Sequence, residues 1–236
     1  MRLENKVAIV VGAGQTPGET LGNGRATALR FAEEGARVLV VDRELDRAEE
    51  TQALIAERGG KAVATAADIT QEADCQAIIE ACLKAYGRID ILHNNVGRSK
   101  GDRATDEMDA DMWDELMAMN LKGMFMTCKH VLPVMREQGS GVIINISSTS
   151  SIAARQTVTY KTSKGAVNTL TQHIASENAG YGIRANAILP GLMDTPMAIE
   201  RRASERNVDR SVVRSERDAK VPLSGKMGTA EDVANA

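Results

Sequence analysis

Short apolar runs alternate with longer amphipathic stretches along most of the chain. The first run, Val7–Val11, contains no polar residue, which is typical of a strand buried on both faces of a parallel sheet. Similar runs predict strands at Arg37–Asp42, Ala62–Ala66, Ile89–Leu92, Val142–Ile146 and Arg184–Leu189. The stretches between them predict helices at about Gly24–Glu34, Leu45–Arg58, Gln71–Tyr86, Asp106–Glu137 and Tyr160–Tyr181. This alternation predicts an α/β fold, a doubly wound parallel sheet with helices on both faces.

Glycines follow most of the predicted helices. The residue just after a helix commonly has the left-handed backbone conformation, which favours glycine. These glycines are Gly35, Gly59–Gly60, Gly87, Gly139 and Gly182. We find no internal repeat and no linker rich in proline or serine, so the 236 residues predict a single domain, 1–236.

A glycine-rich turn joins the first predicted strand to the first helix. Gly12 follows the strand directly, and Gly22, Asn23 and Gly24 stand at the start of the helix. Glycine lets the backbone approach a pyrophosphate closely, and a helix N-terminus presents free N–H groups to it. The turn therefore predicts a dinucleotide site.

Asp42 ends the second predicted strand, where a carboxylate can accept both ribose hydroxyls of NAD and repel the 2′-phosphate of NADP. Arg43 follows it, and an arginine in this region can pair with a 2′-phosphate. We predict NAD as cofactor, with NADP left open.

Tyr160 and Lys164 are four residues apart in a helical pattern and therefore share one face. Ser147 and Ser148 follow a predicted buried strand, at the edge where open α/β sheets bind ligands. A free tyrosine has a pKa of about 10, which a nearby ammonium lowers by favouring the phenolate. Such a tyrosine can protonate an alkoxide or deprotonate an alcohol.

Together these motifs resemble the short-chain dehydrogenase/reductases in their single-domain form. The resemblance extends from Val7 to the C-terminus. Besides the glycine turn it rests on Asp68-Ile69, Asn94-Asn95-Val96-Gly97, Met119-Asn120-Leu121, Ser147-Ser148, Tyr160-Lys161-Thr162-Ser163-Lys164 and Pro190-Gly191. It implies a Rossmann fold and an NAD(P)-dependent oxidoreductase that acts on the CH–OH group of its donor without a metal.

The resemblance also implies a role for each residue. Tyr160 would be the general acid/base, Lys164 would lower its pKa and hold the nicotinamide ribose, and Ser148, rather than Ser147, would bind the substrate oxygen. Asn120 would distort its helix and hold a water behind Lys164. The implied cofactor contacts are Asp68 and Ile69 at the adenine, Asn95 at the adenine-side ribose, and Pro190, Gly191, Leu192 and Thr195 at the nicotinamide.

Three features depart from the family pattern. Gln15–Leu21 looks like an insertion in the glycine turn, and we expect it either to lean over the pyrophosphate or to bulge into solvent. Val11 and Val96 replace a more usual threonine and alanine. The chain stops at Ala236, soon after a helix start at Thr229, so we expect a C-terminal helix and strand to be missing from the sequence shown.

The segment Asp194–Lys220 carries six arginines: Arg201, Arg202, Arg206, Arg210, Arg214 and Arg217. One interpretation is a solvated helical segment. The other is a lid, 192–220, over a substrate that is itself anionic.

Composition narrows the possible partners. Apolar residues make up 43% and charged residues 26%, which excludes a disordered chain. The net charge of −3 and the 3% of aromatic residues argue against binding of nucleic acid. No apolar run is long enough for a membrane span, and Cys75, Cys82 and Cys128 form no pair at a spacing typical of metal sites. We therefore expect a cytoplasmic protein without metal.

The favoured function is hydride transfer between NAD(H) and a small secondary alcohol or ketone. An NADPH-dependent 3-oxoacyl-thioester reductase is the alternative, which the arginine-rich segment favours and Asp42 disfavours. A non-catalytic cofactor-binding scaffold is less compatible with the Asn, Ser, Tyr and Lys set. The resemblance implies a homotetramer or homodimer packed through the helices at Asp106–Glu137 and Tyr160–Tyr181.

Overall fold

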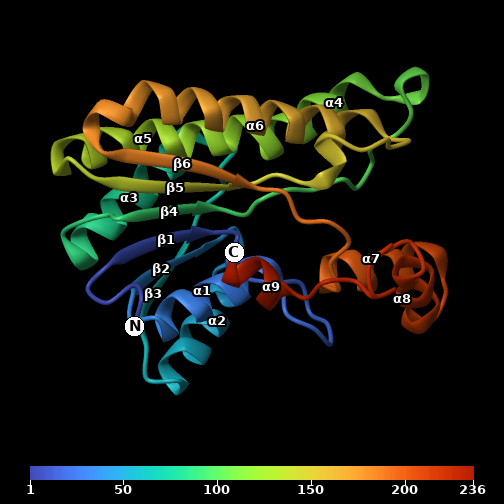
Figure 1. Ribbon diagram of the computed structural model, residues 1–236, viewed down its shortest axis with the longest axis horizontal. Helices are drawn as coiled ribbons and strands as arrows, with labels where there is room; N and C mark the ends of the chain where they lie inside the picture. The colour runs from blue at the N-terminus through green and yellow to red at the C-terminus, as the bar shows by residue number, and fades with distance from the viewer.

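Six parallel strands form one sheet at the centre of the molecule (Figure 1). The computed structural model describes residues 1–236, and the strand order is β3-β2-β1-β4-β5-β6. The strands are β1 Val7–Val11, β2 Arg37–Asp42, β3 Lys61–Ala66, β4 Ile91–Asn94, β5 Gly141–Ile146 and β6 Ile183–Ile188. The order reverses between β1 and β4, so the predicted doubly wound α/β fold is confirmed.

Helices cover both faces of this sheet. They are α1 Asn23–Glu33, α2 Leu45–Glu57, α3 Glu72–Tyr86, α4 Ala110–Met117, α5 Gly123–Gln138, α6 Val158–Asn178, α7 Pro196–Arg206, α8 Arg210–Asp218 and α9 Ala230–Asn235. The side chains of β1 alternate between two cores: Val7, Ile9 and Val11 pack on the side of α3, α5 and α6, and Ala8 and Val10 on the side of α1 and α2. This double burial explains the uninterrupted apolar run of the strand.

The pair α7 and α8 lies apart from these layers, beyond the carboxyl ends of the strands (Figure 1). The first helix starts at Pro196 and the second ends at Asp218, inside the segment that carries the six arginines. The segment is therefore helical, as the first interpretation holds, and it also borders the edge of the sheet where ligands bind.

The predicted continuous helix Asp106–Glu137 is wrong. The chain forms α4, then a π-helical turn at Ala118–Lys122, then α5. Asn120 lies in the turn, accepts the Arg98 N–H at 2.8 Å and donates to the Arg98 carbonyl at 2.9 Å. These long-range bonds favour the wider turn, and periodicity alone does not reveal them.

Smaller differences concern the ends of elements. β4 extends to Asn94 because this polar residue is buried with partners, donating to Asn145 Oδ1 at 2.9 Å and accepting from Thr127 at 2.9 Å. Positive φ angles at Gly35, Gly59, Gly87, Gly139 and Gly182 confirm most of the predicted glycine ends. The helix start at Thr229 is also confirmed, because the Thr229 N–H donates to the Asp232 carboxylate at 2.7 Å.

The lone histidine of β4 and the three cysteines belong to the core. His93 packs edge-to-face against Phe31, and burial lowers its pKa to about 4. Burial raises the pKa of Cys75 to about 11 and those of Cys82 and Cys128 to about 12. No helix of the structure has both the length and the apolar character that crossing a membrane requires.

Candidate active site

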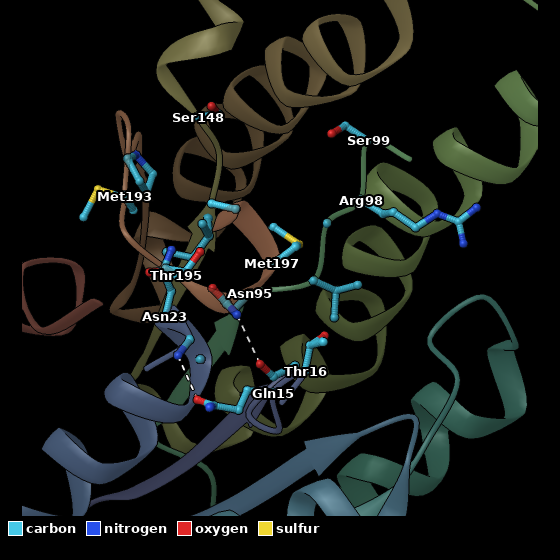
Figure 2. Close-up of a pocket in the computed structure, with 18 of the residues that line it drawn as sticks. Gln15, Thr16, Asn23, Asn95, Arg98, Ser99, Ser148, Met193, Thr195 and Met197 are labelled. Atoms are coloured by element: carbon cyan, nitrogen blue, oxygen red, sulfur yellow. Dashed lines mark hydrogen bonds between the residues drawn. The ribbon is translucent and has the colours of Figure 1, made fainter. Parts of the chain in front are cut away.

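A cleft of about 500 Å³ opens at the carboxyl ends of the strands, where the strand order reverses (Figure 2). Every residue that we predicted for the site lines this cleft except Asn120. Those that line it are Gly12, Gly22, Asn23, Gly24, Asp42, Arg43, Asp68, Ile69, Asn95, Ser148, Tyr160, Lys164, Pro190, Gly191, Leu192 and Thr195. The fold thus brings together side chains that are far apart in the sequence.

At the base of the cleft the glycine turn packs against the start of α1. A Cβ atom on Gly24 would lie 1.9 Å from the Gly12 carbonyl oxygen, so only glycine fits here. The same oxygen accepts from Asn95 Nδ2 at 3.1 Å, which fixes the turn to the loop after β4 (Figure 2). The helix has no side-chain cap, and Asn23 Oδ1 is buried without a partner. This end of the cleft therefore fits a pyrophosphate and its sugar.

The insertion Gln15–Leu21 folds back on itself and docks on the arginine-rich helices. Gln15 Oε1 accepts from the Gly22 N–H at 2.9 Å (Figure 2). Glu19 pairs with Arg210 at 2.6 Å and with Arg214 at 3.1 Å, both on α8. The insertion is therefore exposed to solvent at Thr16–Glu19, as one of the two expectations has it, while two ion pairs of Glu19 hold it against α8.

Asp42 is held in place at the end of β2. Its carboxylate accepts from the Gly14 N–H at 3.1 Å and from the Glu44 N–H at 3.2 Å, and it faces the cleft. A Cβ atom on Gly14 would lie 2.7 Å from Asp42 Oδ2. Arg43 lines the same end but pairs with Glu44 at 3.3 Å. The arrangement offers a fixed carboxylate to a ribose, next to an arginine that already has an acidic partner.

Tyr160, Ser148 and Lys164 lie at the other end of the cleft. Asp102 caps the helix that carries the tyrosine, accepting from the N–H of Thr159 at 2.9 Å and of Tyr160 at 3.0 Å. Lys164 is buried and donates to the Ile146 carbonyl at 2.7 Å. These contacts fix both side chains relative to the end of β5.

The two adjacent serines have different surroundings. Ser147 donates to the Lys164 carbonyl at 2.9 Å and is buried against α6. Ser148 accepts from the Ser150 N–H at 3.1 Å, and its hydroxyl interacts with the Tyr160 phenol. Ser148 is therefore the serine whose hydroxyl lies near the Tyr160 phenol, while the Ser147 hydroxyl is engaged by the helix.

Several positively charged side chains surround Tyr160, among them Lys164, whose Nζ lies 5.8 Å from the centre of the ring. Burial raises the pKa of Tyr160, while Ser148 and the guanidinium groups of Arg155, Arg202 and Arg201 lower it. Arg155 Cζ lies 4.7 Å from the centre of the Tyr160 ring. Burial also lowers the pKa of Lys164 to about 7. The guanidinium groups thus favour the phenolate form against the effect of burial.

Asn120 lies behind the cleft rather than in it. A Cβ atom on Gly97 would come within 2.9 Å of Lys164 Nζ and 3.8 Å of Asn120 Oδ1, so the absence of a side chain at Gly97 lets the loop pass close to both. The Asn120 amide holds the backbone of Arg98. Its role in holding a water stays a prediction.

Sequence reasoning missed three residues that organise the site. Arg155, five positions before Tyr160, could have been found from its closeness in sequence. Asp102 and Gln15 gave no signal, because each acts on backbone groups that only the fold brings near.

Comparison with known proteins agrees with this architecture. The model of the short chain dehydrogenase family matches residues 6–206. A curated relative, 2-(R)-hydroxypropyl-CoM dehydrogenase of Xanthobacter autotrophicus, is 38% identical over 98% of this chain and 89% of its own length.

Two solved structures are also similar over nearly the whole chain. A putative short-chain dehydrogenase/reductase from Burkholderia xenovorans has a TM-score of 0.91 and 38% identity, covering 99% of this chain and 88% of that one. An NAD⁺-bound xylitol dehydrogenase has a TM-score of 0.89 and 30% identity, covering 100% and 91%. The chain belongs to the short-chain dehydrogenase family of oxidoreductases.

Proposed function

We propose that the protein transfers a hydride between NAD(H) and a secondary alcohol or ketone, with Tyr160 as general acid/base. The observation that carries the proposal is one cleft with two distinct ends. The Tyr160 phenol meets the Ser148 hydroxyl at one end, and the glycine turn and the Asp42 carboxylate lie at the other. A similar protein is named a dehydrogenase of a hydroxypropyl compound, which supports a CH–OH group as donor.

Several residues of the cleft would hold the cofactor. The uncapped start of α1 and the glycine turn at Gly12, Gly22 and Gly24 suit the pyrophosphate, and Asp42 suits the adenine-side ribose. We assign Asp68, Ile69 and Asn95 to the adenosine half, and Lys164, Pro190, Gly191, Leu192 and Thr195 to the nicotinamide half. When bound, NAD(H) supplies or accepts the hydride at the substrate carbon.

The chain's own residues handle the proton. In the reducing direction Tyr160 donates its phenolic proton to the carbonyl oxygen while Ser148 donates a hydrogen bond to the same oxygen. In the oxidising direction the Tyr160 phenolate accepts the proton of the alcohol. Arg155 stabilises that phenolate, since its Cζ lies 4.7 Å from the centre of the Tyr160 ring. Lys164 donates to the Ile146 carbonyl and so ties the end of β5 to the helix that carries Tyr160.

We favour NAD(H) over NADP(H) for two reasons. The Asp42 carboxylate lines the end of the cleft that we assign to the adenine-side ribose, and Arg43 pairs with Glu44 at 3.3 Å. The similar xylitol dehydrogenase is described as bound to NAD⁺. An NADPH-dependent 3-oxoacyl-thioester reductase remains the second candidate, since the arginine-rich helices border the cleft.

The proposal is tested by following nicotinamide absorbance with a panel of secondary alcohols and ketones at several pH values. Because burial keeps the pKa of Tyr160 above its ordinary value, alcohol oxidation needs the minor phenolate form and should rise about tenfold per pH unit from pH 7 to 9. Ketone reduction, which uses the protonated phenol, should stay flat over that range. Tight binding of NADH without turnover of any alcohol or ketone would favour the non-catalytic scaffold instead.

We also propose that the protein is a homo-oligomer packed through α4, α5 and α6. Met117, Leu121, Phe125 and Leu170 line a shallow apolar hollow on these helices, and Phe125 is 48% exposed. An apolar surface of this kind suits an isologous contact with a second copy.

Phe125→Asp is expected to dissociate the oligomer, because a two-fold contact would place two carboxylates against apolar surfaces. Sedimentation velocity should show a shift towards the monomer. Leu223→Asp, at a residue that is 84% exposed and outside the hollow, is the matched control and should leave sedimentation unchanged. The same oligomer size in Phe125→Asp and the unmodified protein would contradict this interface.

A further inference from the structure

Four arginine side chains line the cleft beside Tyr160. Arg155 comes from the loop before α6, Arg201 and Arg202 from α7, and Arg217 from α8. We propose that they form an anion subsite, so that the alcohol or ketone substrate carries an acidic oxyanion group: a carboxylate, phosphate or sulfonate. This inference rests on the proposed function and names the chemical class of its substrate.

The arginines of α7 and α8 divide into two sets by their partners. Arg206 forms a two-bond pair with Glu216 at 2.6 and 2.7 Å. Arg210 pairs with Glu19 at 2.6 Å and Glu200 at 2.7 Å, and Arg214 pairs with Glu19 at 3.1 Å and Asp194 at 3.0 Å. This outer set is neutralised within the protein and faces away from the cleft, since none of the three lines it.

The inner set has almost no acidic partner. The single ion pair among the four joins Arg201 to Glu205 at 3.7 Å, and Glu205 does not line the cleft. Arg201 Nε is buried without a hydrogen-bond acceptor. A buried guanidinium N–H without a partner is costly, and an oxyanion is the partner that suits it best.

Neutral groups hold the inner arginines in place. Arg155 donates to Thr157 Oγ1 at 2.7 Å and to Ser150 Oγ at 2.9 Å. Arg202 donates to the Ala198 carbonyl at 2.9 Å, and Arg217 donates to the Met193 carbonyl at 3.3 Å. These bonds orient the guanidinium groups of Arg155, Arg202 and Arg217 without an ion pair, which is the arrangement of a preorganised anion site.

Mutual repulsion accompanies this arrangement. Burial lowers the pKa of Arg202 to about 10, and the charges of Arg217, Arg201 and Arg155 lower it in the same direction. Burial also lowers the pKa of Arg217, and the charges of Arg201 and Arg155 act in the same direction, against the opposite effect of Asp194 and Asp218. An anion placed among these four groups would relieve the repulsion.

The position of the cluster assigns it to the substrate rather than to the cofactor. Arg155 Cζ lies 4.7 Å from the Tyr160 ring, at the reactive end of the cleft. The pyrophosphate end is formed by the glycine turn and the start of α1, where Arg43 and Arg47 are the arginines that line the cleft. The acidic group of the substrate would therefore lie near the carbon that reacts.

The first experiment compares 4-oxopentanoate, 5-oxohexanoate and 6-oxoheptanoate with their methyl esters, together with the sulfonate and phosphonate analogues of equal length, as substrates for reduction by NADH. At least one anionic ketone should exceed its uncharged partner about tenfold or more in kcat/KM. Arg217→Met should lower that value about 10- to 100-fold, mainly through KM, and leave the ester unchanged, whereas Arg202→Met, which also changes the charge near Tyr160, should lower it more for the acid than for the ester. Arg206→Met, which removes an outer arginine, should change neither.

Equal use of acids and esters by the unmodified protein would overturn the proposal. An equal loss of kcat/KM for the acid and the ester in the variants, together with a shift of the alkaline limb of the pH–rate profile, would also overturn it. The arginines would then act only by lowering the pKa of Tyr160.

A second experiment does not depend on turnover. Calorimetric titration with acetate, inorganic phosphate and methanesulfonate, in the presence of saturating NAD⁺, should detect one site that Arg202→Met and Arg217→Met weaken at least tenfold and Arg206→Met retains. Anion binding without turnover of any ketone supports the subsite and contradicts the proposed function. Ketone reduction without anion binding keeps the proposed function and overturns the subsite.

Discussion

Tyr160→Phe is expected to lower kcat by about 10²- to 10⁴-fold, because the variant loses the proton that must reach the substrate oxygen. The ring remains, so the packing of Arg155 over it is preserved. NADH affinity should change less than about threefold, since the phenolic oxygen contributes little to a site that extends to the glycine turn. Single-turnover kinetics and NADH fluorescence titration measure the two quantities separately.

Tyr86→Phe is the matched control for the removed hydroxyl. The Tyr86 hydroxyl donates to the Val38 carbonyl at 3.3 Å, on the sheet and outside the cleft. Its loss should leave kcat unchanged. Full activity of Tyr160→Phe would contradict the assignment of Tyr160 as general acid/base. An equal loss of kcat in both variants would indicate an effect on folding.

The fold was predictable because its signals are local. The run Val7–Val11 is apolar throughout, since its side chains enter two different cores, and a run of this kind can be recognised without the rest of the chain. The glycines that follow the helices can likewise be recognised from their neighbours in the sequence. The π-helical turn around Asn120 was not predictable from periodicity, because it depends on bonds to Arg98, a residue 22 positions away; only the family resemblance implied that Asn120 distorts its helix.

The same distinction explains what the sequence revealed about the site. Asp42, Ser148 and Tyr160 stand at strand ends or on a helix face, and they reach one cleft for that reason. The electrostatics of Tyr160 were harder to foresee. Spacing indicated Lys164 as a cation near the phenol, and the fold adds arginines from α7 and from the loop before α6. Which arginines of a charged segment face inward depends on acids elsewhere, such as Glu19 in the inserted loop.

Asp42→Asn is expected to reverse or abolish the preference for NADH. The carboxylate would accept hydrogen bonds from the ribose hydroxyls and repel a 2′-phosphate, and the amide oxygen can still accept the Gly14 N–H that positions the side chain. NADH should bind about 10- to 100-fold more weakly, which corresponds to hydrogen bonds to a charged group. NADPH should bind more tightly than in the unmodified protein, because Arg43 and Arg47 also line this end of the cleft.

Fluorescence titration of both cofactors decides whether Asp42 has this role, with Asp46→Asn as the matched control for a lost negative charge. Asp46 lies in the first turn of α2, close in sequence, and does not line the cleft. Its variant should keep the NADH preference, because a charge outside the cleft is screened by solvent. An unchanged preference in Asp42→Asn would mean that the carboxylate serves only the turn at Gly14. A preference for NADPH in the unmodified protein would make Arg43 and Arg47 the dominant charges and would favour the thioester reductase.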